Sequence, residues 1–483
     1  MESVGLFRRG ILAAAAIVPP FLCQAQDAGG SAAGDDMKEI VCEIDAARTR
    51  DRLSPYVYAQ FIEHLGRCIY GGIWAEMLED RKFCFPVTDK YDPYRGSGGL
   101  PKESPYAVVG ASPWRVIGPE KSVMMATNTP FAGVHSPRIA AGAGIQQNDL
   151  GVLKGKRYAG HVWLRAPAGG ASATVTLSPS GGKAVIKGVG NEYTRRDFAF
   201  AATESTDKAS LKIAVEGAPV EVGAVSLMPE DNVHGMRADT LAVLKQLNAP
   251  MYRWPGGNFV SGYDWRDGVG DRDRRPPRRN PAWTGVEHND FGLDEFMVFC
   301  REVGAEPLVV VNTGFGDASS AAEEGGYANG SPKSVMGGWR AANGHRDPYG
   351  VKWWGIGNEM YGAWQLGNMK LGHYTIKHNE AVERMRRVDP GIMTIAVGAV
   401  GEWSEGMLKN CAGSMTLISE HFYVGKGLDD TVAHVEQVRS NIRGKAEAHR
   451  KYREQIPGLA GRDIRIAMDE WNYWYHDYVY GEL

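Results

Sequence analysis

The sequence predicts an α/β protein built on a (β/α)8 (TIM) barrel, with an all-β sandwich inserted into it. From residue 236 onward, short continuous apolar runs alternate with segments whose apolar residues recur at helical spacing. This pattern is typical of parallel strands covered by helices. Between residues 104 and 229, short alternating runs follow one another between Gly, Ser and Asn turns. Such runs favour an antiparallel β-sandwich.

The first residues are typical of a secretory signal peptide. Arg8 and Arg9 precede an apolar run at 11–18, and small residues with a candidate cleavage position at Ala25 follow. The run is too short for a membrane span. We therefore expect a signal peptide over 1–25 and a secreted or periplasmic protein, with the general and the twin-arginine export routes both open. Residues 26–38 are rich in Gly, Ala, Ser and Asp, which indicates a flexible leader.

The barrel elements are expected on both sides of the sandwich. Residues 39–103 hold an N-terminal strand at 39–46 and the first barrel unit, and residues 230–483 hold strands two to seven. The expected barrel strands are 56–63, 251–254, 307–312, 351–356, 392–400, 415–422 and 464–469, and the expected helices are 236–247, 293–303, 374–388 and 431–454. A closed barrel of this type has eight strands. The sequence up to Leu483 therefore predicts a barrel that lacks its eighth strand.

Charge and cysteine content exclude several classes of function. The net charge of −3 gives no electrostatic reason to expect nucleic acid or a membrane surface as a partner. Of the 6 cysteines, Cys23 lies in the signal peptide, and no two are spaced as a C-x-x-C pair. No Cys/His cluster has the spacing of a zinc site. We expect no metal and no cofactor, and the sequence leaves a homo-oligomer open.

Two carboxylates end apolar strands. Glu359 follows the run at 353–358, and Glu470 follows the run at 464–468. Catalytic groups in this barrel lie at the carboxyl ends of the strands. Hydrolysis of a glycosidic bond needs one carboxylic acid to protonate the leaving oxygen and one carboxylate to attack the anomeric carbon. We expect burial among aromatics such as Trp353 and Trp354 to raise the pKa of the acid, and positive neighbours to keep the nucleophile ionised.

Other polar groups are expected at the same mouth of the barrel. They are Glu63 and His64 at the end of the first strand, Arg253 to Asn258 at the end of the second, Asn312 at the end of the third, and His421 and Tyr423 at the end of the sixth. Each alone could be a buried polar group with a structural partner. Together they predict a pocket for a polyhydroxylated ligand.

Five segments carry a family resemblance, in the order in which they occur in the chain. They are FIEHLGRCIYGG at 61–72, YRWPGGNF at 252–259, GIGNE at 355–359, SEHFY at 419–423 and DEWN at 469–472. In these segments the chain resembles the α-L-arabinofuranosidases of glycoside hydrolase family 51, over roughly residues 39–92 and 236–480. The Asn-Glu pair alone would indicate only the wider clan of barrel glycosidases.

The resemblance implies roles for individual residues. It implies that Glu359 is the general acid/base and Glu470 the nucleophile of a retaining hydrolase. It also implies an arabinose subsite lined by Glu63, Arg253, Asn258, Asn358, His421 and Tyr423. The basic run at 272–279 resembles a loop of the family, and we expect it to be solvated or to lie at the edge of the substrate.

The chain departs from the family in two places. Residues 104–229 resemble the jelly-roll carbohydrate-binding modules of some members, with sugar binding and a scaffold role both open. Trp114, Tyr158, Trp163 and Tyr193 are the aromatic candidates for sugar stacking. The family also has an eighth barrel strand with a glutamine in the sugar site and then a C-terminal β-sandwich. We expect a chain ending at Leu483 without them to fold poorly and to be inactive.

The expected activity is release of terminal α-L-arabinofuranosyl groups from arabinose-containing plant polysaccharides such as arabinan and arabinoxylan. Two alternatives remain open. The first is another glycosidase on the same barrel, an endoglucanase or a β-xylosidase. The second is a sugar-binding protein or fragment without turnover, against which the presence of both Glu359 and Glu470 argues.

Overall fold

The protein is described from a computed structural model, which covers residues 45, 47–49, 52–95, 108–180, 182–425 and 430–473. The expected signal peptide and leader, and all but Asp45 of the strand expected at 39–46, lie outside the described residues. The chain divides into two units at Arg52, and everything below concerns the second, residues 53–483. No helix among the described residues has the length and apolarity to cross a membrane.

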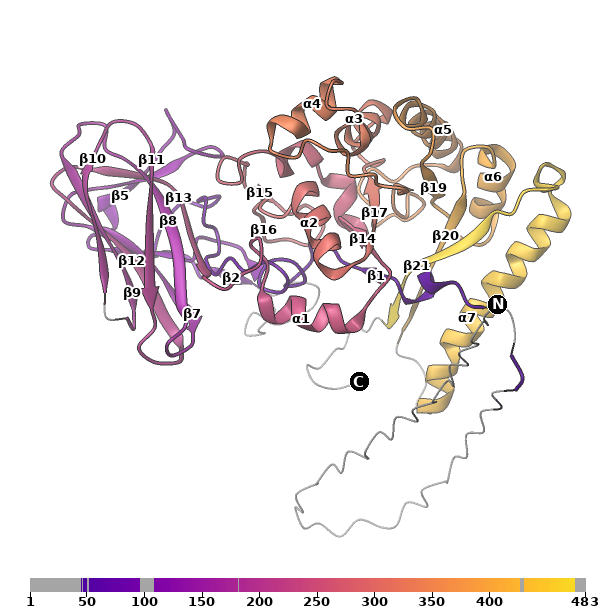
Figure 1. Ribbon diagram of the computed structural model, residues 1–483, viewed down its shortest axis with the longest axis horizontal. Helices are drawn as coiled ribbons and strands as arrows, with labels where there is room; N and C mark the ends of the chain where they lie inside the picture. The colour runs from indigo at the N-terminus through magenta and orange to yellow at the C-terminus, as the bar shows by residue number, and fades with distance from the viewer. Residues whose placement is uncertain are drawn as a thin grey trace, which may run out of the picture. The chain divides into compact units, whose positions relative to one another are not determined.

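Seven parallel strands form the sheet that carries the site (Figure 1). In their order across the sheet they are β1 (Gln60–Phe61), β14 (Met251–Trp254), β17 (Glu306–Val311), β18 (Trp353–Ile356), β19 (Met393–Ala396), β20 (Leu417–Val424) and β21 (Arg465–Tyr473). Sequence order and spatial order agree, and every neighbouring pair is parallel. This is a nearly closed barrel, with β1 and β21 as its two edges within the described part of the chain. The prediction of seven barrel strands is confirmed.

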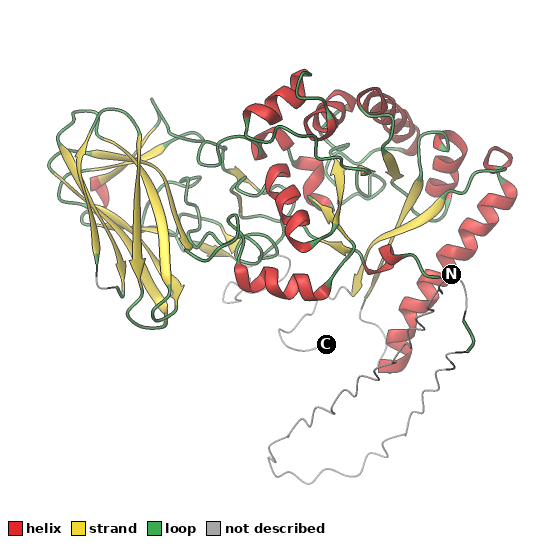
Figure 2. Cartoon of the chain, viewed as in Figure 1, coloured by secondary structure: helices red, strands yellow, loops and turns green. Residues whose placement is uncertain are grey.

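Helices accompany the strands along the chain (Figure 2). They are α1 (Ala238–Leu247), α2 (Leu293–Val303), α3 (Ala318–Asn329), α4 (Val335–Ala342), α5 (Leu371–Val388), α6 (Glu402–Cys411) and α7 (Thr431–Gln455). The amphipathic pattern predicted α1, α2, α5 and α7. It did not predict α3 and α4, whose sequences each contain a Gly-Gly pair, nor α6. Side-chain caps from Asp317 and Ser334 begin α3 and α4.

The start of the first barrel strand differs from the expectation. Residues Pro55–Tyr58 form a 3-10 turn, with Ser54 accepting a hydrogen bond from the Tyr56 amide, and β1 comprises only Gln60–Phe61. Proline at the first helical position favours such a turn because its missing N–H is not needed there. The predicted strand at 56–63 is therefore wrong over its first half.

The all-β insertion between the first two barrel strands is confirmed. Two antiparallel five-stranded sheets enclose one apolar core. Their strands are β4 (Trp114–Ile117), β5 (Val123–Ala126), β6 (Ser136–Ile139), β7 (Gly144–Val152), β8 (Arg157–Arg165), β9 (Ala171–Ser178), β10 (Lys183–Val189), β11 (Thr194–Ala201), β12 (Thr206–Glu216) and β13 (Val220–Pro229). Alternating burial along β9 and β12 shows one face in the core. The finer resemblance to a jelly roll stays a prediction.

The four aromatic candidates for sugar stacking in the insert are all engaged in contacts within the protein. Trp114 and Tyr158 are buried in its core. The indole N–H of Trp163 donates to Asp273, and the hydroxyl of Tyr193 donates to Glu221. The rings of Trp163 and Tyr193 also pack against Phe131.

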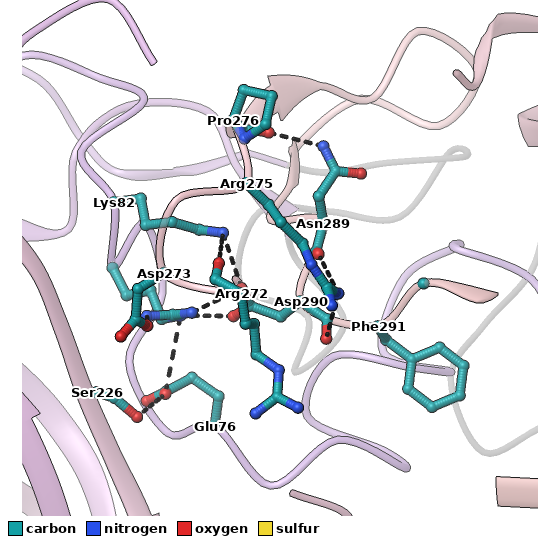
Figure 3. A network of polar contacts seen from close by, with 12 residues as sticks. Glu76, Lys82, Ser226, Arg272, Asp273, Arg275, Pro276, Asn289, Asp290 and Phe291 are labelled. Atoms are coloured by element: carbon teal, nitrogen blue, oxygen red, sulfur yellow. Dashed lines mark hydrogen bonds and ion pairs between the residues drawn. The ribbon is translucent and has the colours of Figure 1, made fainter. Parts of the chain in front are cut away.

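A buried ionic network joins the insert to the loop after β14 (Figure 3). Arg81 binds Asp290 with Nε and Nη2 at 2.5 and 2.7 Å, and binds Asp273 with Nη1 at 2.8 Å. His161 and Trp163 of β8 contact the other oxygen of Asp273 at 2.7 and 2.8 Å. Arg81 and the two side chains of β8 therefore both hold the loop in place.

The expectation that the basic run at 272–279 is solvated is wrong for its central part. Asp273 and Arg275 are buried, and Arg275 donates two hydrogen bonds to Glu295 on α2. Arg274 and the short strand β15 (Arg278–Arg279) at the end of the run are exposed. Buried charges are retained when each has a partner of opposite sign. Here the acidic partners lie far from the run in sequence, so composition alone could not reveal them.

Replacing Arg81 with methionine should lower the free energy of unfolding by about 3–5 kcal/mol, because it leaves the buried carboxylates of Asp273 and Asp290 without their main partner. Denaturant unfolding measures this change. Arg195→Met is the matched control, since the exposed Arg195–Asp197 pair should contribute at most about 1 kcal/mol. Equal effects of the two substitutions on the free energy of unfolding would contradict the conclusion that the buried network stabilises the protein.

Candidate active site

Glu359 is placed by a tight turn at the end of β18. Gly357 has φ +88°, and a Cβ there would lie 1.8 Å from the hydroxyl oxygen of Thr313, so only glycine fits. Glu359 itself has a positive φ of 41°. Strained backbone of this kind gathers at functional sites. The turn directs the Glu359 carboxylate toward His421 on β20.

Glu470 is placed by a bulge in β21. Ser419 of β20 pairs with Ala467, and His421 pairs with Glu470, so three steps on β21 match two steps on β20. Regular strands send neighbouring side chains to opposite faces, and one extra residue changes this alternation. As a result Asp469 and Glu470 both contact groups in the site.

The carboxylate of Glu470 is held by two donors. Arg253 donates from Nη1 to Oε2 at 3.0 Å, and Tyr423 donates its hydroxyl to Oε1 at 2.6 Å. Arg253 also donates from Nη2 to Oδ1 of Asn358 at 2.6 Å. A Cβ at Gly257 would stand 3.0 Å from Glu470 Oε2, so the Gly-Gly turn after β14 gives the carboxylate its room. Arg253 is thus a positive neighbour of Glu470, as the sequence led us to expect for this carboxylate.

The carboxylate of Glu359 accepts hydrogen bonds from an aromatic rim. Trp364 donates its indole N–H at 2.6 Å, and Tyr361 donates its hydroxyl at 3.2 Å. Trp364 is 61% exposed, so its ring also lies open to an incoming ligand. The aromatics that contact Glu359 therefore follow it in sequence, whereas Trp353 and Trp354 lie in apolar clusters.

One carboxylate oxygen of Glu359, one of Glu470 and a ring nitrogen of His421 all lie within 4.8 Å of one another. Carboxyl groups in retaining glycosidases lie about 5–5.5 Å apart, and in inverting ones about 6.5–9.5 Å. The same three ligand atoms could in principle surround a cation. A charged imidazole does not bind metal, and His421 is held in its charged form by the groups described next.

Burial alone would lower the pKa of His421, but the carboxylates of Glu470 and Asp469 outweigh it and raise the pKa to about 10. Burial raises the pKa of Glu359, but the hydrogen bond and charge of His421 outweigh it and hold this pKa below its ordinary value. The expectation that aromatic burial raises the pKa of the acid is therefore wrong for the free site. His421 and Glu359 instead share one proton between Nδ1 and Oε1, 3.0 Å apart.

Glu63 forms the other side of the site, after β1. Its Oε1 accepts from the Phe259 amide at 2.9 Å and from the Trp283 indole at 2.8 Å. Burial raises its pKa to about 7 in spite of these hydrogen bonds, and the charge of Glu470 adds to the rise. A carboxyl with this pKa can serve as donor or as acceptor toward a hydroxyl-bearing ligand near neutral pH.

The structure brings together seven of the eight residues expected in the site: Glu63, Arg253, Asn358, Glu359, His421, Tyr423 and Glu470. Asn258 is half-buried at the start of the 3-10 turn Asn258–Gly262, and none of its contacts joins it to the two carboxylates. Sequence reasoning missed Trp283, Trp364 and Asp469. Asp469 directly precedes the expected nucleophile, but an alternating strand would have turned it away.

A nearly closed parallel barrel with two glutamates facing each other across the carboxyl ends of its strands is the arrangement of a barrel glycoside hydrolase.

Comparison with known proteins shows which members of this class the chain is similar to. The sequence model of the α-L-arabinofuranosidase 1 domain matches residues 243–443. An intracellular exo-α-(1→5)-L-arabinofuranosidase of Bifidobacterium longum is 33% identical over 265 residues, 52% of this chain and 46% of that relative. A probable α-L-arabinofuranosidase C of Aspergillus fumigatus is 40% identical over 185 residues, 38% of this chain and 37% of that relative. An arabinose-bound family 51 α-L-arabinofuranosidase has the same fold, with a TM-score of 0.60 at 20% identity, over 75% of this chain and 61% of that one.

Residues 243–443 of the barrel thus match the α-L-arabinofuranosidase 1 domain, in agreement with the resemblance of the sequence to glycoside hydrolase family 51. The chain spans about half the length of the curated relatives that it matches.

The raised pKa of Glu63 predicts a pH-dependent stability. The folded protein binds a proton at Glu63 up to pH about 7, and the unfolded chain only up to about 4.5. Stability therefore falls as pH rises through this window, by up to about 3 kcal/mol. Glu63→Gln keeps an acceptor for Phe259 and Trp283 and removes this loss.

The variant should accordingly gain stability relative to the native protein between pH 5 and pH 8, as measured by denaturant unfolding. Glu216→Gln, at an exposed position on β12, serves as the control. A difference between Glu63→Gln and the native protein that stays constant across this pH range would contradict the prediction.

Proposed function

We propose that this protein is a retaining exo-acting α-L-arabinofuranosidase that releases terminal α-L-arabinofuranosyl groups from arabinose-containing polysaccharides or oligosaccharides. The observation that carries the proposal is the short separation of the Glu359 and Glu470 carboxylates, with Glu470 held by Arg253 and Tyr423. A carboxylate with two donors on its oxygens is held in one orientation, as a nucleophile requires.

In the first step Glu470 attacks the anomeric carbon and forms a covalent glycosyl-enzyme intermediate. Glu359 gives its proton to the departing glycosidic oxygen, so that the leaving group departs as a neutral alcohol. Because His421 and Glu359 hold one proton between them, the acid is available when substrate excludes water from the pair. Arg253 and Tyr423 keep the nucleophile in place during the attack.

In the second step the same groups act in reverse. Glu359, now a carboxylate, takes a proton from a water molecule, and the resulting hydroxide attacks the anomeric carbon. The bond to Glu470 breaks, and its electron pair returns to the carboxylate beside Arg253. Two inversions at one carbon give net retention of configuration.

The substrate class is supported by the relatives, which are named as arabinofuranosidases, several as exo-acting enzymes on α-(1→5) linkages. The alternatives of an endoglucanase or a β-xylosidase have no such support. Glu63 and Trp283 offer polar atoms that suit the hydroxyls of a terminal sugar. An arabinose-containing carbohydrate is therefore the expected partner.

The insert fits a scaffold role within this function. Its strand β8 fixes Asp273, and the same loop continues to Asn280, whose amide donates to the His64 carbonyl, and to Trp283, whose indole donates to Glu63. The insert thus supports the wall of the sugar pocket through the loop. Its four aromatic candidates for sugar stacking are occupied in internal contacts.

Export from the cytoplasm is supported by the sequence of the first 25 residues, with Arg8 and Arg9 before an apolar run. Several of the bacterial relatives are named as intracellular enzymes. Secretion or periplasmic location would distinguish this protein from them and would give it access to polymeric arabinans.

The native protein should hydrolyse 4-nitrophenyl α-L-arabinofuranoside and leave the β-D-xyloside and β-D-glucoside nearly untouched. Glu470→Ala should abolish turnover, and azide should restore it with formation of an inverted glycosyl azide. Glu359→Ala should retain activity on the aryl glycoside and lose about 10²-fold or more on arabinan, because only a poor leaving group needs the acid.

Glu380→Ala, which removes an exposed carboxylate on α5, is the control and should behave as the native protein does. Hydrolysis of the xyloside or glucoside without the arabinofuranoside would overturn the proposed substrate. Identical behaviour of the Glu359 and Glu470 variants on both substrates would overturn the assigned roles.

A further inference from the structure

Asp469 is a buried carboxylate beside the nucleophile to which the proposed mechanism gives no task. It lies in the bulge of β21 and turns into the site together with Glu470. Its side chain is 13% exposed. The nearby positive charges of Arg253 and His421 outweigh its burial and lower its pKa to about 2, so it is ionised throughout the working pH range.

The contacts of Asp469 converge on His421. Its Oδ1 lies 3.1 Å from His421 Nε2 and accepts the Ser419 hydroxyl at 2.5 Å. Its Oδ2 lies 3.4 Å from Arg253 Nε. The Ser419 oxygen is also 2.9 Å from His421 Nε2. Since the only proton of this hydroxyl goes to Asp469, the serine oxygen can accept from His421 but cannot donate to it.

These contacts fix which ring nitrogen of His421 carries a permanent proton. Both groups that face Nε2 are acceptors, so Nε2 must carry a hydrogen. The remaining nitrogen, Nδ1, faces Glu359 Oε1 at 3.0 Å. It donates to the carboxylate when the ring is charged and accepts from the protonated Glu359 when the ring is neutral. A carboxylate that fixes the tautomer of a histidine is a known device for directing proton transfer.

We propose that Asp469 is a positioning residue for acid catalysis: it holds the Nε2–H form of His421, so that Nδ1 can pass the shared proton to Glu359. This inference rests on the proposed function, because it names how the acid of that reaction receives its proton. Without Asp469 the imidazole could hold its proton on Nδ1 alone. Glu359 would then stay ionised and could not protonate a leaving group.

Other charged and titratable groups surround the His421–Glu359 pair from every neighbouring element. They are Arg253 on β14, Glu470 on β21, Tyr361 after β18, Tyr423 on β20 and Glu63 after β1. Arg253 donates to Glu470 at 3.0 Å, whereas its Nε lies 3.4 Å from Asp469. An effect of Asp469 that acted through Arg253 would disturb the nucleophile, and so every substrate, to the same extent.

The test uses Asp469→Asn in the full chain and two substrates with different leaving groups. For methyl α-L-arabinofuranoside, which needs the acid, kcat/KM should fall about 10²-fold. For the 4-nitrophenyl glycoside it should fall less than about 5-fold, since this leaving group departs without a proton. The basic limb of the pH profile should move about one pH unit lower, because the pair loses a neighbouring negative charge that stabilised its proton.

The ratio of the two substrates measured on one sample does not depend on the fraction of folded protein. Asp463→Asn, which removes an exposed carboxylate just before the same strand, is the matched control and should change neither the ratio nor the pH profile. Ser419→Ala should shift the ratio in the same direction as Asp469→Asn, but by less. A loss of equal size on both substrates, or an unchanged ratio, would overturn the inference.

A second readout is independent of activity. In the protein labelled with 15N-histidine, His421 should show a proton on Nε2 at all pH values at which the protein is folded, and Asp469→Asn should move it toward the Nδ1–H form. An unchanged ring in the variant would overturn the inference. A native protein with no arabinofuranosidase activity would overturn the proposed function instead, and the tautomer measurement would still decide the role of Asp469.

Discussion

The buried guanidinium of Arg253 is the group on which the rest of the site depends. From β14 it reaches Asn358 at the tip of β18 and both Asp469 and Glu470 on β21. Its planar fork is suited to hold several acceptors in one geometry. A charge this deeply buried is tolerated only with partners of opposite sign. The same contacts that satisfy Arg253 therefore hold the nucleophile on an edge strand of the sheet in place.

His421 is the second positively charged group beside these carboxylates. His421 stands between the Glu359 and Glu470 carboxylates and is held in its charged form by the acidic groups around it. Two positive groups thus separate carboxylates that would otherwise repel one another at the mouth of the barrel. One of these cations, Arg253, cannot lose its proton, whereas His421 can. This difference assigns the structural task to the arginine and the proton transfer to the histidine.

Strand positions and the placement of Glu359 and Glu470 at the strand ends could be predicted from the sequence, and their finer environment could not. The run at 307–311 within β17 is continuous and apolar, a pattern that favours a buried parallel strand. The bulge before Glu470 leaves no such trace, because it depends on pairing with β20. The partners of Glu359 were misjudged for a similar reason. Trp353 and Trp354 precede it in sequence, but both lie in apolar clusters away from the carboxylate.

The contacts between the insert and the barrel could not be predicted from the sequence either. Charges in the run at 272–279 read as solvated because their partners come from segments that are distant in sequence: Arg81 near the first strand and His161 on β8. Because these groups are buried, a loop that the sequence suggested to be on the surface supports the wall of the pocket. Long-range pairs of this kind become visible only when the fold brings the segments together.

The stereochemistry of hydrolysis tests the central claim most directly. Proton NMR of an aryl α-L-arabinofuranoside during the first minutes of hydrolysis shows which anomer forms before mutarotation. The separation of at most 4.8 Å between oxygens of Glu359 and Glu470 leaves no room for a water molecule to attack from the side of Glu470. The account predicts the α-anomer as the first product. The β-anomer as the first product would contradict it, because inversion requires a single displacement by water.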